Sequence, residues 1–329
     1  MRTLHMDEKY LLGIDVGGTS VKIGLFTESG QQKEKWSIAT NKDNNGEHVL
    51  EDIARSILTK WNEHGLSAAD VKGAGIGVPG FVDVKKGMIQ FAVNIGWVDY
   101  PVASILSDFL QIPVVLDNDA NLAAAGEYWQ GAGNDAADVL LLTLGTGVGG
   151  GVIVNGDILH GVSDMAGEIG HVTVVPRNGA PCNCGKTGCL ETVSSATGMV
   201  RMAEAEAVKH PDSMLYIKKQ QTPLTAQILF ECAAACDETA AAVVDQSMHY
   251  LGMAAGNAAN VLNPQRIVIG GGVSAAGEQL LTPLRSHYAV HALPRVADHT
   301  SFATAELGND AGIIGAAWLA KHKAASGGL

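Results

Sequence analysis

The apolar residues of this chain form short runs that alternate with longer amphipathic stretches. Short runs rich in valine, isoleucine and leucine occupy residues 11–26, 71–78, 139–154 and 266–270, and each is interrupted or ended by glycine. Between them, residues 48–65 and 239–262 space their apolar positions as helices do. Strands that alternate with amphipathic helices predict an α/β fold.

The glycines mark where these strands turn. The chain has 40 of them, and 18 lie in segments 13–24, 73–80, 144–156 and 267–277, each beside a strand-like run. Glycine beside β-branched residues is typical of a sharp turn at a strand end. We therefore read these segments as turns and exclude a flexible linker.

The order of elements repeats along the chain. Residues 11–26 and 139–154 both read as strand, glycine turn, strand, and residues 71–80 and 266–274 both read as a strand ending in glycines. This matching order suggests a duplicated domain with a cleft between the two copies.

Composition narrows the class of protein. With 329 residues the chain can form two domains, and its 47% hydrophobic and 17% charged content is that of a globular protein. The net charge of −12 argues against nucleic acid or an anionic membrane as partner. We see no signal peptide and no membrane-spanning stretch of about 20 apolar residues, so we expect a cytoplasmic protein. There, clustered cysteines favour metal binding or redox chemistry over disulfides.

Three patterns compete as phosphate loops. Gly185-Lys186-Thr187 fails the Walker pattern, because Ala180 stands where that pattern needs glycine. Segment 145–150 matches G-x-G-x-x-G but precedes a strand, and the helix after Gly270–Gly272 lacks the acidic residue of a dinucleotide fold. The hairpin turns remain, since consecutive backbone N–H groups can bind an anion without lysine. With Asp15 beside the first turn to hold Mg²⁺-bound water, they indicate a nucleotide phosphate site.

Seven motifs resemble the ROK family of sugar kinases, nearest to its bacterial glucokinases. They are DVGGTSVK, GVPGFVD, NDANLAAAGE, LGTGVGGG, GEIGH, CNCGKTGCLE and LGNDAG, in family order from about residue 10 to about residue 320. The resemblance implies an α/β fold of two actin-like (ribonuclease H-like) domains with an interdomain active-site cleft. We expect a smaller domain of residues 1–118 plus a C-terminal helix of about 308–329, and a larger one of 119–307 that carries a zinc loop.

The activity implied is transfer of a phosphoryl group from ATP, with Mg²⁺, to the 6-hydroxyl of glucose. N-acetylglucosamine, N-acetylmannosamine or fructose as acceptor, and polyphosphate as donor, stay open. Many ROK proteins are instead sugar-responsive repressors with an N-terminal helix-turn-helix domain. We expect an enzyme, because only about ten residues precede the first glycine motif and the charge does not suit DNA. A homodimer is the family expectation.

The resemblance also implies roles for individual residues. Asp119 is the expected general base, a role that accelerates proton transfer by roughly 10²–10⁴-fold. Expected sugar contacts are Gly77, Gly80, Asn118, Glu168, His171 and Glu191. Expected ATP contacts are Asp15 near Mg²⁺, Gly17, Gly18, Thr19, Gly145, Thr146 and Gly147 at the phosphates, and Gly271 and Gly272 beside the adenosine. Asp117, where many relatives carry Glu, receives no role.

Three of the five cysteines lie within eight residues. His171, Cys182, Cys184 and Cys189 supply one imidazole and three thiols, a set that suits tetrahedral Zn²⁺. The C-x-C-x₄-C spacing is uncommon, but it matches the CxCGxxGC motif of the family. Four protein ligands leave no open position, so we expect a structural zinc that fixes the loop from Glu168 to Glu191 against the sugar.

Overall fold

A computed structural model describes residues 8–325, which fold into two compact units. The first unit runs to Asn134 and includes Ile158–Ala166 and the chain from Asn309 onward, and the second comprises Asp135–Asp157 and Gly167–Gly308. Within the described range, no helix has both the length and the apolar content needed to cross a bilayer.

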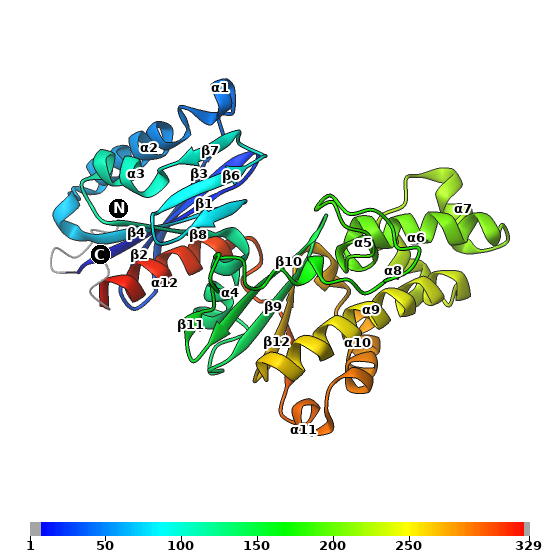
Figure 1. Cartoon of the computed structure of the whole chain (residues 1–329). Helices are drawn as coiled ribbons and strands as arrows, with labels where there is room; N and C mark the ends of the chain where they lie inside the picture. The colour runs from blue at the N-terminus through cyan, green and yellow to red at the C-terminus, as the bar shows by residue number, and fades with distance from the viewer. Residues whose placement is uncertain (1–7, 326–329) are drawn as a thin grey trace. The chain divides into compact units, whose positions relative to one another are not determined.

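The first unit is built on a five-stranded sheet with helices on both faces (Figure 1). Its strands are β1 (Tyr10–Val16), β2 (Ser20–Thr27), β3 (Gln32–Ala39), β4 (Val71–Val78) and β8 (Val114–Asn118). Its helices are α1 (Asp43–Gly46), α2 (Val49–His64), α3 (Val102–Leu110), α4 (Asp119–Gln130) and α12 (Ala311–Ala325). A small second sheet contains β5 (Phe81–Asp83), β6 (Met88–Ala92) and β7 (Trp97–Tyr100).

The second unit has a sheet of its own and a larger set of helices. Its strands are β9 (Val139–Leu144), β10 (Val148–Val154), β11 (Asp157–Ile158, whose last residue belongs to the first unit), β12 (Arg266–Gly270) and β13 (Ser301–Thr304). Its helices are α5 (Glu191–Ser194), α6 (Ala196–Lys209), α7 (Met214–Gln221), α8 (Ala226–Ala234), α9 (Glu238–Leu262), α10 (Glu278–His291) and α11 (Pro294–Ala297).

The two sheets have the same topology, as the repeated order along the sequence suggested. The orders are β3-β2-β1-β4-β8 and β11-β10-β9-β12-β13. In each, a tight antiparallel hairpin (β1–β2 or β9–β10) is followed by two parallel strands on the side of the hairpin's first strand. The predicted α/β fold with two actin-like domains is confirmed.

Glycines in β1 and β4 allow α12 to lie directly on the sheet. A Cβ on Gly13 would collide with the Ile313 carbonyl, and one on Gly75 would collide with the Ala316 carbonyl. The residues on either side of each glycine in its strand point to the opposite face of the sheet, because neighbouring strand residues face opposite sides. They join the hydrophobic core under α2 and α3. These strand glycines therefore serve helix packing.

The same close packing joins α4 to α12 and shifts the domain boundary. A Cβ on Gly315 would meet the Leu122 carbonyl, and one on Gly126 would meet that of Ala311. Helix α4 therefore belongs to the first unit, which extends to Asn134, whereas the sequence placed the boundary after Asn118. The strand-to-helix junction that carries Asp119 lies wholly inside this unit.

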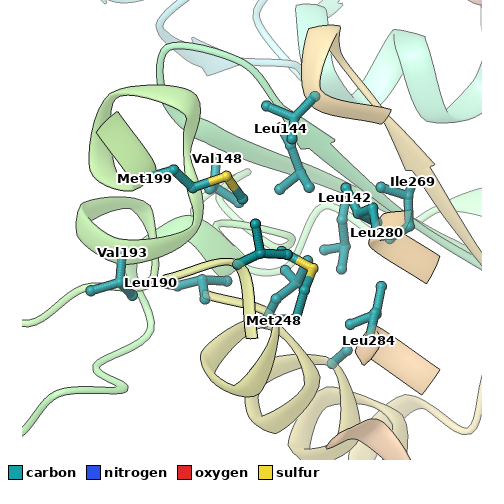
Figure 2. Packing of buried hydrophobic residues seen from close by; sticks show 14 of the residues in the cluster. Leu142, Leu144, Val148, Leu190, Val193, Met199, Met248, Ile269, Leu280 and Leu284 are labelled. Carbon is teal, nitrogen blue, oxygen red and sulfur yellow. The ribbon is translucent and has the colours of Figure 1, made fainter. Parts of the chain in front are cut away.

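The core of the second unit joins its sheet to the segment after the cysteines. Figure 2 shows Leu142, Leu144 and Val148 packing with Leu190 and Val193 on one side and with Met248 and Leu284 on another. Cys189 and Leu190 are both fully buried. The C-terminal end of the predicted zinc loop is thus anchored in the core.

Candidate active site

Asp119 lies at the start of a helix, directly after a strand. The Asn118 side chain caps α4 by accepting from the Ala120 and Asn121 amides, and the Asp119 Oδ1 accepts from the Ala120 amide at 3.0 Å. Burial raises the pKa of the Asp119 carboxyl above its usual range, although hydrogen bonds from backbone amides act to lower that pKa. A carboxylate with raised proton affinity is suited to accept a proton from a hydroxyl.

A second carboxyl in the first unit lies near Asp119. Asp15, in β1, has its pKa raised from 3.8 to about 6, chiefly by burial, with a smaller contribution from the charge of Asp119. The Lys22 ammonium lies 4.0 Å from Asp15 Oδ2 and lowers that pKa, and it also donates to the Asn309 carbonyl. Two acidic groups and one cation thus gather at one place.

The turn between β1 and β2 contains the predicted phosphate contacts Gly17, Gly18 and Thr19. The Gly17 amide closes the turn by donating to the Ser20 carbonyl at 3.0 Å, whereas the amides of Gly18 and Thr19 have no acceptor in the part of the chain that the structure describes. Among the described residues, only the Lys42 ammonium approaches a Cβ position built on Gly18, at 3.6 Å. The turn is therefore open and has a cation beside it, and sequence reasoning missed this lysine.

Close packing explains why positions 77 and 80 are glycine. A Cβ on Gly77 would lie 2.9 Å from Leu122 of α4, and one on Gly80, whose φ is +137°, would collide with the Phe91 carbonyl. The Gly80 carbonyl accepts from the Asn118 side-chain amide at 3.1 Å. The GVPG segment is thus tied to the residue next to Asp119, and the glycines are explained without a ligand.

The second unit contains a cavity of about 850 Å³ at the turn between β9 and β10. Gly145, Thr146 and Gly272, all predicted ATP contacts, line it. A Cβ built on Gly145 or Gly272 would meet no described atom within 4 Å, so both face open space. The volume lies in the range typical of small-molecule sites.

The opposite wall of this cavity was not anticipated. Helix α8 and the first turn of α10 provide Gln227, Phe230, Glu231 and Gln279. The Gln227 side chain donates to the Glu231 carboxylate at 2.8 Å. The helical pattern of this segment predicts its structure, but no motif distinguishes the residues that face the cavity.

Glu191 connects the second glycine turn to the cysteine loop. Its Oε2 accepts from the Val148 amide at 3.2 Å, and its Oε1 lies 3.6 Å from the Cys182 sulfur. A Cβ on Gly147 would collide with this carboxylate, so Gly147 has no free space of its own. Glu191 therefore has neighbours inside the unit on both oxygens.

The four predicted zinc ligands come together. Their ligand atoms all lie within 4.8 Å of one another, including His171 Nδ1 at 3.6 Å from the Cys182 sulfur, and Cys184 and Cys189 with their sulfurs 3.6 Å apart. His171 directs its other ring nitrogen to Glu168, at 3.8 Å. Since tetrahedral zinc holds sulfur at about 2.3 Å, these separations suit one ion.

Lys186 of the GKT sequence has a partner within this loop. Its ammonium donates to the His171 carbonyl at 2.6 Å. Lys186, which does not belong to a Walker motif, thus links the two ends of the cysteine loop. Of the remaining cysteines, Cys232 is buried and Cys236 is exposed, and neither joins a metal-binding group among the described residues.

Comparisons with known proteins agree with this geometry. The model of the ROK family matches residues 11–323. A glucokinase from Halalkalibacterium halodurans is 51% identical over 97% of both chains. Among solved structures, a ROK hexokinase from Thermus thermophilus has a TM-score of 0.80 and 31% identity, over 96% of this chain and 99% of that one. A ROK family glucokinase from Streptomyces griseus, in complex with glucose and AMPPNP, has a TM-score of 0.74 and 32% identity, over 95% and 99%. This chain belongs to the ROK family.

Proposed function

We propose that this protein is an ATP-dependent glucokinase, which transfers the γ-phosphoryl group of ATP to the 6-hydroxyl of glucose. The observation that carries the proposal is the 51% identity, over 97% of both chains, to a glucokinase. The solved relative in complex with glucose and AMPPNP supports both the acceptor and the donor.

In this proposal Asp119 is the general base. Its position at the start of α4 and the raised pKa of its carboxyl suit a group that takes the proton of the sugar hydroxyl as the oxygen attacks phosphorus. Asn118, Glu168, His171 and Glu191, with the backbone at Gly77 and Gly80, orient the sugar. These groups suit a ligand whose polar groups are hydroxyls, because carboxylates accept from hydroxyls, whereas an amide N–H or the Nε2–H of a metal-bound imidazole donates to them.

The nucleotide is proposed to bind at the glycine turns of both units. The cavity beside Gly145, Thr146 and Gly272 has room for an adenosine. Gly271, the residue before Gly272, is assigned to the same site, and its φ of +80° lies in the left-handed region. The turns at Gly17–Thr19 and Gly145–Gly147 are assigned to the phosphates. The amides of Gly17 and Gly145 close the turns, so those of Gly18, Thr19, Thr146 and Gly147 are the proposed donors to phosphate oxygens. Phosphoryl transfer depends mainly on such positioning and on charge neutralisation.

Two metal ions complete the proposal. Asp15 is assigned to the Mg²⁺ that would accompany ATP and neutralise phosphate charge. Zn²⁺ is assigned to His171, Cys182, Cys184 and Cys189, where it fixes the loop that ends in Glu191 and takes no part in the chemistry. We further propose a cytoplasmic homodimer that acts in glycolysis. The net charge of −12 argues against a nucleic-acid partner.

Steady-state kinetics tests the function and the base together. ADP release with Mg-ATP is measured for glucose, mannose, fructose, N-acetylglucosamine and N-acetylmannosamine, and glucose should have the highest kcat/KM. Asp119→Asn should lower kcat by roughly 10²–10⁴-fold while glucose binding, measured by calorimetry, stays largely intact. Asp108→Asn, an exposed aspartate on α3, is the matched control.

A higher kcat/KM for an N-acetyl sugar would replace the proposed substrate and keep the mechanism. Retained turnover in Asp119→Asn would remove Asp119 as the base. Turnover with polyphosphate in place of ATP would change the donor.

A further inference from the structure

A buried ion pair lies directly next to the proposed base. Asp117, at the end of β8, has no exposed surface, and its Oδ2 lies 2.6 Å from His160 Nε2. Its Oδ1 accepts from the Asn118 amide at 2.7 Å and from the Asn121 side-chain amide at 2.9 Å. One carboxylate therefore holds the residue before Asp119 and a residue two positions after it.

His160 comes from a distant segment of the chain. Residues 158–166 are a short segment of the first unit. In the sequence, this segment lies between the two segments that make up the second unit. The His160 carbonyl accepts from the Ala166 amide at 3.0 Å, and Asp164 Oδ2 accepts from the Val84 amide at 3.2 Å. The segment is thus closed by a hydrogen bond of its own and is attached to the rest of the first unit at Asp164 and at His160, whose imidazole contacts Asp117 of β8.

The surrounding charges favour the protonated form of the His160 imidazole. Burial alone would lower the pKa of His160, but the bond to Asp117 and the charges of Asp117 and Asp164 raise it above its usual value, against the opposing charge of Lys323 on α12. A buried carboxylate left without its cationic partner would be strongly disfavoured. The pair is therefore a fixed feature of the junction between β8 and α4.

We propose that Asp117 and His160 are positioning residues for phosphoryl transfer, which hold the junction of β8 and α4 so that the Asp119 carboxylate faces the reacting hydroxyl. This inference rests on the proposed function. The hydrogen bonds printed for the Asp119 carboxyl come from backbone amides, those of Ala120 and of Asp119 itself, so its orientation depends on the backbone around it. A displacement of about 1 Å at a reacting group can lower a rate about 100-fold.

The test compares three variants with the wild-type enzyme. His160→Ala should lower kcat about 100-fold, with KM for glucose changed by less than about threefold. His160→Gln should recover much of the loss, because its amide can donate to Asp117 from a place close to that of Nε2. Asp117→Asn should resemble His160→Ala. His64→Ala is the matched control, since His64 pairs with Glu34 elsewhere in the first unit and its loss should leave kcat unchanged.

A purely structural role gives a different result. Melting temperature and folded fraction would fall in His160→Ala, while kcat per folded molecule stayed near the wild-type value and Gln gave no rescue. That outcome overturns the inference.

Amide hydrogen exchange decides the same point without turnover. Residues 118–122 should exchange faster in His160→Ala and Asp117→Asn than in the wild type or His64→Ala, and equal exchange in all four would refute the inference. An inactive wild type would refute the proposed function instead, and the exchange result would still decide whether the pair holds the junction.

Discussion

Replacement of Asp15 by asparagine should stabilise the free protein while abolishing its proposed activity. The Asp15 side chain is 22% exposed, and its carboxyl pKa is about 6 where 3.8 is ordinary. Ionised Asp15 is therefore disfavoured in the folded protein relative to the unfolded chain. Asparagine has nearly the same shape and carries no charge, so it removes this cost.

The magnitude follows from the two pKa values. The difference between 3.8 and about 6 corresponds to about 3 kcal/mol of unfolding free energy at pH 8. The favourable charge of Lys22, 4.0 Å away, is already contained in that pKa. Asp15→Asn should thus unfold at a higher urea concentration than the wild type.

The sign of the effect sets its pH dependence. Below pH 3.8 Asp15 is protonated in both states, and the variant and wild type should be equally stable with respect to this group. As pH rises from 3.8 to about 6, the unfolded chain ionises while the folded protein keeps its proton, so the wild type loses stability relative to the variant. Above pH 6 the difference should be constant.

Urea unfolding at pH 4.5, 6 and 8, without magnesium or nucleotide, measures this difference. Asp70→Asn is the control of opposite sign, because the Ser67 hydroxyl and amide hold the pKa of Asp70 below its usual value. That variant should lose stability at pH 8. An Asp15→Asn variant no more stable than the wild type at pH 8 would refute the reasoning.

Three other changes test separate parts of the molecule. Cys184→Ser should bind less zinc, as measured by mass spectrometry, and should bind glucose on the order of tenfold more weakly. The control Cys236→Ser should keep both its zinc and its glucose affinity. Zinc loss with unchanged glucose affinity would contradict the role of zinc in fixing the loop. Gly315→Ala should lower the free energy of unfolding in urea by about 1–3 kcal/mol, because the added Cβ would meet the Leu122 carbonyl. An unchanged urea midpoint would mean that the contact between α4 and α12 can widen without cost. Glu231→Ala should raise KM for ATP several-fold with little change for glucose, and an unchanged KM for ATP would remove the cavity as the nucleotide site.

Features that depend on neighbours in the sequence were predicted well. The hairpins at residues 11–26 and 139–154 follow from β-branched runs around glycine, and the structure pairs Leu11 with Phe26 and Leu144 with Val148. The metal-binding group could be found because its four ligands lie within one short segment. Asp119 could be placed at a helix start because Asn118 is a capping residue directly before an alanine-rich helix.

Features that join distant segments were decided by the tertiary structure. Asp117 is 43 residues from His160, and nothing in the local pattern of either segment indicates the other. The cavity wall from α8 and the attachment of α12 to a sheet some 300 positions earlier are of the same kind.

The physical reason is that local pattern and long-range packing encode different information. Backbone preferences and glycine φ angles act over a few residues, so the sequence by itself determined the strands, the turns and the clustered thiols. Which buried carboxylate meets which imidazole, and which helix can approach a glycine strand, depends on how whole elements pack. Only the folded chain brings Asp117 and His160 together beside Asp119.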